Sequence, residues 1–360
     1  MLTPVEILSA AVTRDASDVH IAAGCLPTLR VHGRLSPLGD TALTPEDTLR
    51  FVREITPSKH LDLLATRGGS DFSYEFQAKH LFRVSIFKQR GMASVVMRLI
   101  PGATRPLADI GLGDRVHELL NRPRGLVLVT GPTGCGKSTT LAAMVDCINR
   151  ERDCNIITIE DPIEYRHTHN KSIVVQREVG EDVPSFEEAL VRALRQDPDV
   201  ILVGEMRNLE TIEAAVRAAE TGHLVFSTLH TTSAARTVDR IVDVFPANHR
   251  DEIRTQLSGT LLAVISQQLL PRIGGGRVAA FEIMFNTTSI AAYIRDNKTY
   301  RIISDLQTGA KFGMCAMDMS LMTLYTQNQI TYSDMLAACY DRDSLQKMLD
   351  NYAAMQPKHR

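Results

Sequence analysis

The chain has 360 residues, of which 44% are hydrophobic and 23% are charged, and its formal net charge is -2 at pH 7. A chain of this length and composition buries large cores and usually folds as two or three domains. Its Lys and Arg residues are spread along the sequence, so the charge pattern indicates no nucleic-acid-binding surface and we expect no nucleic acid partner.

Neither membrane insertion nor secretion is indicated. The longest apolar runs, such as 126–129 and 261–265, are far shorter than the roughly 18 residues that cross a bilayer. The first residues, MLTPVEILSA, lack the basic start and long apolar stretch of a signal peptide. The six cysteines form no CxxC pair and have no histidine at metal spacing, so we expect reduced thiols, no zinc and a cytoplasmic protein.

Residues 1–100 predict a small α+β domain. Its helical patterns cover 5–14, 45–55 and 59–66, and its extended patterns cover 28–31, 71–76, 81–87 and 94–100. The apolar residues of the second and third extended patterns alternate with period two, which is typical of an antiparallel sheet with one buried face. Pro and Gly residues between 101 and 106 then indicate a linker, which we assign to 101–115.

From Gly125 the pattern changes to short, continuous apolar runs separated by amphipathic helices, which predicts a mostly parallel sheet covered on both faces. The runs are 126–130, 156–160, 200–205, 224–230 and 278–284. We place this domain at 116–285 and expect a mainly helical region at 286–360.

Three local patterns support the helices of this domain. The helix after Ser138 carries Leu141, Val145 and Ile148 on one face. Ser185 and Glu188 predict a capping box, and Gly222 predicts the C-cap of a helix that begins near Leu209.

The strongest chemical signal is GPTGCGKS at 131–138, which matches G-x-x-x-x-G-K-[ST] between a predicted strand and a predicted helix. Glycines let backbone amides wrap a phosphate, Lys137 reaches the β- and γ-phosphates, and the Ser138 hydroxyl ligates Mg²⁺. A chance glycine-rich turn is the alternative, and the strand and helix on either side disfavour it. We therefore expect ATP and Mg²⁺ as cofactors, with nucleotide contacts from Gly131, Thr133, Gly134, Cys135, Gly136, Lys137, Ser138 and Thr139.

Acidic residues follow two of the predicted strands. Glu160, Asp161 and Glu164 lie after one run and Glu205 after the next, where an open α/β sheet places its ligand crevice. Phosphoryl transfer needs one carboxylate near Mg²⁺ and another that polarises the attacking water. Solvated or capping carboxylates are the alternative, and the position of these residues after the phosphate loop favours catalysis.

Two histidines, His223 and His230, lie at the two ends of the fourth run, 224–230. At a separation of seven on a strand, His223 and His230 point to opposite faces, so a shared metal site is not indicated. A histidine at a strand end is usually structural, but His230, at the carboxyl end, is the better candidate to sense the γ-phosphate.

Four segments resemble the Walker A, Asp, Walker B and His boxes of bacterial secretion ATPases. They are GPTGCGKSTTLAAMVD, IITIEDPIEY, DPDVILVGEMRNLET and AAETGHLVFSTLHTTSA, and the resemblance is strongest from 124 to 282. The most similar subgroup is that of the type IV pilus retraction ATPases.

This resemblance implies an N-terminal PAS-like domain, a RecA-like ATPase domain and a ring of six subunits that acts on an inner-membrane pilus platform protein from the cytoplasmic face. It assigns Glu164 as general base, Glu205 as the Walker B acid near Mg²⁺, and His223 and His230 to the His box, with His223 as a nucleotide contact and His230 as a catalytic residue. Arg83 and Arg98 match arginines that complete the nucleotide site, although an exposed arginine on a strand is more often a surface or ion-pair residue.

Two features bear on the choice within the family. Pilus extension and type II secretion ATPases commonly carry a paired-CxxC zinc element and a longer N-terminal region, and the lack of both here favours retraction. The retraction signature AIRNLIRE, however, is present only as SIAAYIRD at 289–296. An extension or type II/IV secretion ATPase, a nucleic-acid translocase and a non-enzymatic nucleotide-binding regulator therefore remain alternatives.

Overall fold

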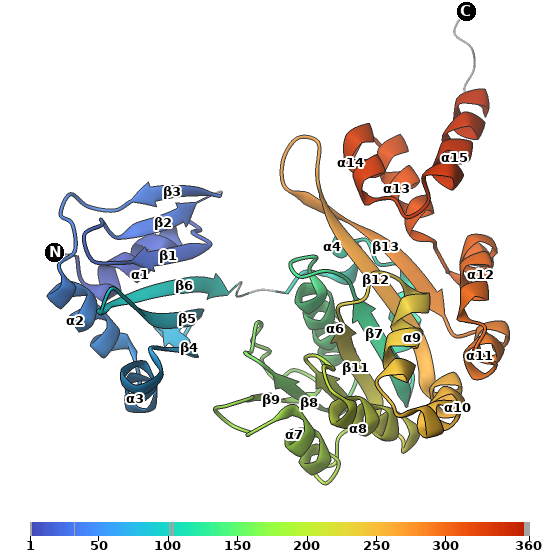
Figure 1. Ribbon diagram of the computed structural model, residues 1–360, viewed down its shortest axis with the longest axis horizontal. Coiled ribbons are helices and arrows are strands. Elements are labelled where there is room, and N and C mark those ends of the chain that lie inside the picture. Colours follow the sequence, from blue (N-terminus) through green and yellow to red (C-terminus); the bar gives the residue numbers. More distant parts are fainter. Residues whose placement is uncertain (1, 32, 101, 103, 356–360) are drawn as a thin grey trace, which may run out of the picture. The chain divides into compact units, whose positions relative to one another are not determined.

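The computed structural model describes residues 2–31, 33–100, 102 and 104–355. Part of the expected linker, at 101 and 103, and the last residues of the expected helical region, 356–360, lie outside this description. The chain divides into two compact units (Figure 1), of which the first comprises Met1–Ala103 with Pro162–Arg166 and the second comprises Thr104–Asp161 with His167–Arg360.

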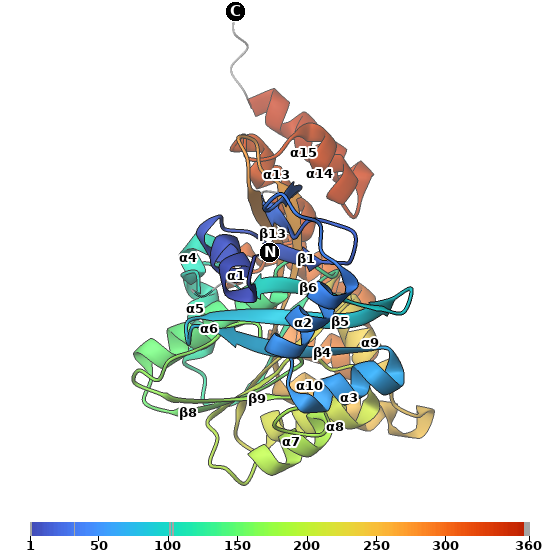
Figure 2. The ribbon, with the colours of Figure 1, turned by 90° about the vertical axis from the view of Figure 1, so that its left-hand side faces the viewer.

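The first unit is built on a six-stranded antiparallel sheet in the order β3-β2-β1-β6-β5-β4. Three helices cover one face of the sheet, which is the face that Figure 2 shows. The elements are α1 (Pro4–Thr13), β1 (Asp18–Ile21), β2 (Thr28–Val31), β3 (Arg34–Pro37), α2 (Pro45–Ile55), α3 (Ser58–Arg67), β4 (Gly69–Phe76), β5 (His80–Gln89) and β6 (Met92–Ile100). The expected α+β fold with an antiparallel sheet is confirmed, although β1 and β3 were not predicted.

Local sequence explains these elements. Thr3 with Glu6 and Thr44 with Asp47 form capping boxes, and each is followed by a proline at the start of its helix. On β5, alternate residues such as Phe82 point into the core, where that side chain is fully buried. Complete burial of one such side chain stabilises the fold by about 1.5–3 kcal/mol.

The second unit contains a seven-stranded sheet in the order β13-β12-β7-β11-β10-β8-β9. All neighbouring strands are parallel except β12 and β13, which form an antiparallel pair at one edge. The strands are β7 (Gly125–Thr130), β8 (Asn155–Glu160), β9 (Ile173–Glu178), β10 (Val200–Val203), β11 (Leu224–Leu229), β12 (Leu261–Pro271) and β13 (Arg277–Phe285). The mostly parallel sheet is confirmed, and β9 at the opposite edge exposes Ile173 and Val175.

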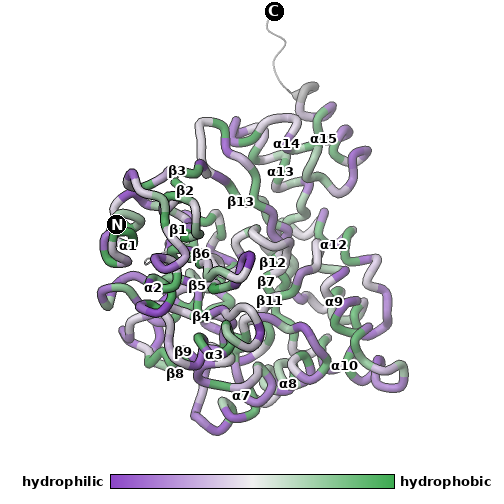
Figure 3. The backbone as a smooth tube through the Cα atoms, turned by 60° about the vertical axis from the view of Figure 1, so that its left-hand side comes forward, coloured by the Kyte–Doolittle hydropathy of each residue, from purple (hydrophilic) through white to green (hydrophobic). Residues whose placement is uncertain are grey.

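Helices cover both faces of this sheet, as predicted. One face packs against α5 and α6 through Val127 and Val129, and the other packs against α7, α8, α9 and α10 through Leu126 and Leu128. Hydrophobic stretches (green) run through the central strands in Figure 3, whereas the connecting turns are mostly hydrophilic (purple). The helices are α4 (Leu107–Ile110), α5 (Asp114–Leu120), α6 (Lys137–Glu151), α7 (Phe186–Ala193), α8 (Leu209–Glu220), α9 (Ala234–Asp243), η1 (Ala247–His249) and α10 (Arg250–Thr260).

One of the three local predictions for these helices holds in full and one holds in part. Leu141, Val145 and Ile148 are all buried on α6. At the start of α7 the Ser185 side chain accepts a hydrogen bond from the Glu188 amide, but the Glu188 side chain pairs with Arg192, so the Ser185 cap is confirmed and the full capping box is not. The third is corrected by one residue, since α8 has Thr221 as its C-cap and Gly222 follows with a φ of 123°.

After β13 the described chain is mainly helical. It contains α11 (Thr288–Arg295), η2 (Thr299–Arg301), α12 (Ile302–Thr308), η3 (Gly309–Phe312), α13 (Met317–Thr326), α14 (Tyr332–Ala338) and α15 (Arg342–Met355). The last three helices share a small core with Leu270 and Ala280 of the β12–β13 pair. Within the described residues, every helix is too short or too polar to traverse a lipid bilayer.

A buried carboxylate on β13 joins the starts of two helices. Glu282 is 5% exposed, and it accepts hydrogen bonds from the backbone amides of Ala234, the first residue of α9, and Met317, the first residue of α13. Burial raises the pKa of Glu282 to about 7, and the two amides partly oppose that shift. Glu282 therefore stays largely protonated in the folded chain at mildly acidic pH.

This pKa shift makes stability depend on pH. Between about pH 4.5 and pH 7 the unfolded chain releases the Glu282 proton while the folded chain keeps it, so stability falls as pH rises through this window. Glu282→Gln should remove this dependence. As the pH rises from about 5 to about 8, the free energy of unfolding of the variant should therefore increase by up to roughly 3 kcal/mol relative to that of wild type. Urea unfolding at both pH values measures the difference. Glu213→Gln, on the exposed face of α8, is the matched control, and equal pH slopes for wild type and Glu282→Gln would contradict the assignment.

Candidate active site

The glycine-rich loop joins β7 to α6 in the second unit. Gly131, Gly134 and Gly136 have φ values of 141°, 80° and 93°, which a side chain would strain. At Gly131 a Cβ atom would also lie 2.3 Å from the carbonyl oxygen of Gln267 on β12. Glycine is therefore required at this position both for its backbone conformation and for the close approach of a neighbouring strand.

Lys137 lies at the start of α6 and folds back over the loop. Its Nζ donates hydrogen bonds to the carbonyl oxygens of Gly131 at 2.8 Å and Pro132 at 3.1 Å, and the residue is 9% exposed. Ser138 and Thr139 follow in the first helical turn and are half-buried. The amides of this turn and the positive end of the helix dipole form an anion site beside a lysine and a hydroxyl.

Gln267 on β12 holds the loop in place, and the sequence analysis did not identify it. Its Nε2 donates to the Cys135 carbonyl oxygen at 2.6 Å, and its Oε1 accepts from Thr140 Oγ1 at 2.9 Å. Next to it, the hydroxyls of Ser266 and Thr130 are 2.8 Å apart. The only signal in the sequence is that three polar residues, Ser266, Gln267 and Gln268, interrupt an otherwise apolar run.

Glu205 and His230 meet at the carboxyl ends of the strands, in the sheet that carries the loop. The two residues follow the neighbouring parallel strands β10 and β11, and β11 also pairs with β7. Arg207 Nη2 contacts Glu205 Oε1 at 2.6 Å, and His230 Nε2 lies 3.5 Å from Glu205 Oε2. The bond to Glu205 raises the pKa of Arg207, so this arginine stays charged beside a carboxylate that is only 13% exposed.

The first acidic cluster is divided between the two units. Glu160 ends β8 and its Oε1 accepts from Thr158 Oγ1 at 2.7 Å and from Gln176 Nε2 at 3.1 Å. Glu164 belongs to the segment Pro162–Arg166, which groups with the first unit. Glu164 thus belongs to the other unit from the loop, whereas Glu160 lies on the sheet that carries the loop.

The structure does not bring His223 to the loop. The residue precedes β11, at the end opposite to His230, and six strand residues of about 3.3 Å each separate the two. The His223 Nδ1 lies 2.9 Å from the Ala218 carbonyl oxygen at the end of α8. This contact gives His223 a structural partner within the chain, and its contact with nucleotide stays a prediction. Both histidines lie just outside β11.

Arg83 and Arg98 lie side by side in the first unit. They are directly opposite each other on the antiparallel strands β5 and β6, and both are exposed. The same row continues with Asp18 on β1, opposite Arg98, and Arg30 on β2, opposite Asp18. Like charges directly opposite on a sheet destabilise it, so this row needs its single carboxylate.

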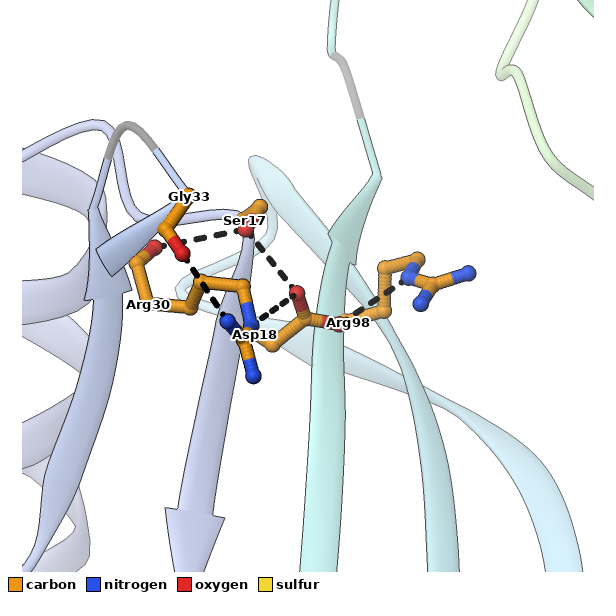
Figure 4. Close-up of polar contacts among 5 residues, drawn as sticks. All are labelled: Ser17, Asp18, Arg30, Gly33 and Arg98. Carbon is orange, nitrogen blue, oxygen red and sulfur yellow. Dashed lines mark hydrogen bonds and ion pairs between the residues drawn. The ribbon is translucent and has the colours of Figure 1, made fainter. Parts of the chain in front are cut away.

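Asp18 holds two of these arginines (Figure 4). Arg98 Nε donates to Asp18 Oδ1 at 3.0 Å, and Arg30 Nε lies 3.8 Å from Asp18 Oδ2. Ser17 Oγ donates to Asp18 Oδ2 at 2.9 Å, and Arg30 Nη1 donates to the Gly33 carbonyl oxygen at 3.0 Å. The tip of the Arg98 guanidinium points away from Asp18, and its side chain is 66% exposed. Arg98 is thus both an ion-pair partner and an exposed cation.

The chain is similar to known proteins over most of its length. The family described as type II/IV secretion system protein matches residues 2–276. The type IV pilus retraction ATPase PilT of Pseudomonas aeruginosa is 47% identical over 91% of this chain and 95% of its own length. The type IV pilus ATPase PilU of the same organism is 39% identical over 96% of this chain and 90% of its own length. A crystal structure of the pilus retraction motor PilT with bound ADP superimposes with a TM-score of 0.92 at 48% identity, covering 97% of this chain and all of that one.

These similarities and the geometry of the loop define an ATP-hydrolysing P-loop enzyme that binds nucleotide. The chain belongs to the type II/IV secretion system protein family.

The role of Gln267 can be tested by removing its two hydrogen bonds. Gln267→Leu keeps the approximate volume but leaves the Cys135 carbonyl oxygen without this donor, so we expect nucleotide affinity to fall about tenfold, equivalent to about 1.4 kcal/mol. Titration of the purified chain with ADP measures it. Gln268→Leu is the matched control, because the neighbouring side chain bonds to Ala338 instead of the loop. Equal affinity of wild type and Gln267→Leu would show that the loop holds its shape alone.

Proposed function

We propose that the chain is an ATP-driven motor for type IV pilus retraction. The observation that carries this proposal is the extent of the similarity to PilT, which includes the first unit and the C-terminal helices as well as the ATPase core. The absence of a CxxC pair from the sequence agrees with it. The domain organisation that we propose follows the sequence: a PAS-like domain at 1–100, a linker at 101–115, a RecA-like domain at 116–285 and helices at 286–360.

The nucleotide site takes its parts from the loop and the next strands. Loop amides from Gly131 to Gly136 surround the phosphates, Lys137 turns from its own carbonyls to the β- and γ-phosphates, and Ser138 with Glu205 holds Mg²⁺. Hydroxyl and carboxylate oxygens are the donors that Mg²⁺ prefers, and Glu205 is nearly buried at the edge of the sheet that carries the loop. Bound Mg²⁺ neutralises charge on the phosphates.

The remaining residues act on the attacking water and the γ-phosphate. Glu164 accepts the proton of the water as general base, and His230, beside Glu205, senses the γ-phosphate. Arg83 and Arg98 supply positive charge to the γ-phosphate oxygens of a neighbouring subunit in a hexameric ring. Asp18 orients Arg98 through Nε and leaves its exposed tip directed outward, which supports this role.

The ring converts this chemistry into force. The arginines and the loop belong to different units of the chain. Closure of a subunit interface around ATP therefore moves one unit relative to the other, and hydrolysis reverses this closure. We place the ring at the cytoplasmic face of the inner membrane, where a pilus platform protein receives the rotation and pilin subunits leave the base of the fibre.

The catalytic assignment predicts that one carboxamide variant and one alanine variant lose different functions. Glu164→Gln should bind ATP with near wild-type affinity and lose hydrolysis by at least about 100-fold, because the water then lacks its base. Lys137→Ala should lose both binding and turnover, since the phosphate charge is no longer met. Phosphate release and nucleotide titration measure the two effects, and unchanged hydrolysis in Glu164→Gln would move the role of base to another residue.

Deletion of the gene in its own host separates retraction from the alternative outputs. Loss of a retraction motor should leave surface pili in place and abolish twitching, and the wild-type gene should restore motility while Lys137→Ala should not. Loss of pili, or of secretion with normal twitching, would instead assign an extension or secretion ATPase. This experiment is needed because α11, which covers the segment that resembles the retraction signature AIRNLIRE, carries Ala291 and Ala292 in place of its arginine and asparagine.

A further inference from the structure

Three side chains that bind metals well converge on the second unit, away from the phosphate loop. They are His117 on α5 and Cys147 and Glu151 on α6, and their ligand atoms all lie within 4.8 Å of one another. The His117 Nε2 is 2.8 Å from Glu151 Oε2, and the Cys147 Sγ is 3.5 Å from Glu151 Oε1. The carboxylate thus lies between an imidazole and a thiol.

The fold itself brings these donors together. Cys147 and Glu151 are four residues apart on α6, so they share one face of that helix. His117 reaches them because Val116 and Leu120 of α5 pack into the same hydrophobic core as Ile148 of α6. The cluster remains accessible to an ion from solvent, since the side chains of His117 and Glu151 are 41% and 46% exposed.

We propose that His117, Cys147 and Glu151 bind a divalent transition metal ion of the Zn²⁺ class, with water as the fourth ligand. Zn²⁺ takes nitrogen, sulfur and oxygen ligands in one tetrahedral site, and sites with three protein ligands keep an open position. The ion replaces the proton of the Cys147 thiol, which passes to solvent. Mg²⁺ prefers oxygen donors alone, so we expect this cluster to bind it poorly.

The end of α6 favours a cation at this place. Glu151 is the last residue of the helix, where the unpaired carbonyl groups give a partial negative charge. Lys137, at the other end, begins the same helix, and a rise of 1.5 Å per residue separates the two by about 21 Å along the axis. The metal site is thus distinct from the nucleotide site, and a bound ion fastens α5 to the far end of the helix that carries the loop.

The sequence analysis expected no zinc because the cysteines form no CxxC pair. Thirty residues separate His117 from Cys147 in the sequence, so only the packing of two helices reveals the cluster. The plain alternative is an ion pair between His117 and Glu151 with a neighbouring thiol that takes no part. The pair of His249 and Glu252, 3.5 Å apart, gives an internal reference for such an arrangement.

Titration with Co²⁺ tests the proposal on the full chain after treatment with a chelator. Wild type should bind one equivalent and develop the thiolate-to-cobalt charge-transfer band and the strong visible bands of a tetrahedral site. Cys147→Ser should lose the charge-transfer band and bind at least about tenfold more weakly. Cys154→Ser, which changes another half-buried cysteine of the same unit, is the matched control and should resemble wild type.

Further variants separate the ligands from the fold. His117→Ala and Glu151→Gln should each weaken Co²⁺ binding, whereas His249→Ala should not, and circular dichroism checks that each variant is folded. Zn²⁺ should raise the melting temperature of wild type but not of Cys147→Ser, because an ion that binds only the folded chain stabilises the folded chain. Failure of wild type to bind Co²⁺, or identical spectra for wild type and Cys147→Ser, would overturn the proposal, and neither result would affect the ATPase assignment.

Discussion

The nucleotide site depends on the close approach of the loop backbone to strand β12. Gly131 permits this approach because it has no side chain, and Gln267 then bonds to the loop at Cys135 and to α6 at Thr140. A parallel sheet places the ends of β7, β10 and β11 at one edge, so the same arrangement delivers Glu205 and His230. One strand contact therefore supports the geometry of the loop and of the residues that we propose for catalysis.

Much of the fold could be read from the sequence, and the omissions have physical causes. Strands buried on both faces, such as β7, give continuous apolar runs that are easily recognised. Strand β12 was not predicted because Ser266, Gln267 and Gln268 break its apolar run, and β9 was not predicted because its exposed Ile173 and Val175 hide the alternation of buried and exposed positions. The loop was found from spacing alone, whereas Gln267 lies more than 100 residues away and no local pattern could connect it. His223 and His230 were expected to point to opposite faces of one strand, and the structure places them just beyond the two ends of that strand.

In the row of charges in the first unit, one carboxylate stabilises the sheet and also holds Arg98 in a way that suits the role proposed for it. Without Asp18, the exposed arginines on β2, β6 and β5 would repel one another across the sheet. With it, Arg98 is held by one nitrogen and keeps the rest of its guanidinium accessible. An arginine fixed in this way loses less side-chain freedom when it meets a phosphate than one that moves freely.

Glu282 has a mechanical consequence for the C-terminal helices. Its carboxylate bonds to the first amide of α9, just after the His box, and to the first amide of α13, and Tyr340 Oη also donates to the carbonyl oxygen of Thr232. Pulling α13 away from β13 would expose a buried carboxylate and withdraw support from the turn after His230. If the chain works as the proposed motor, displacement of the C-terminal helices would therefore reach the turn after His230 through these hydrogen bonds.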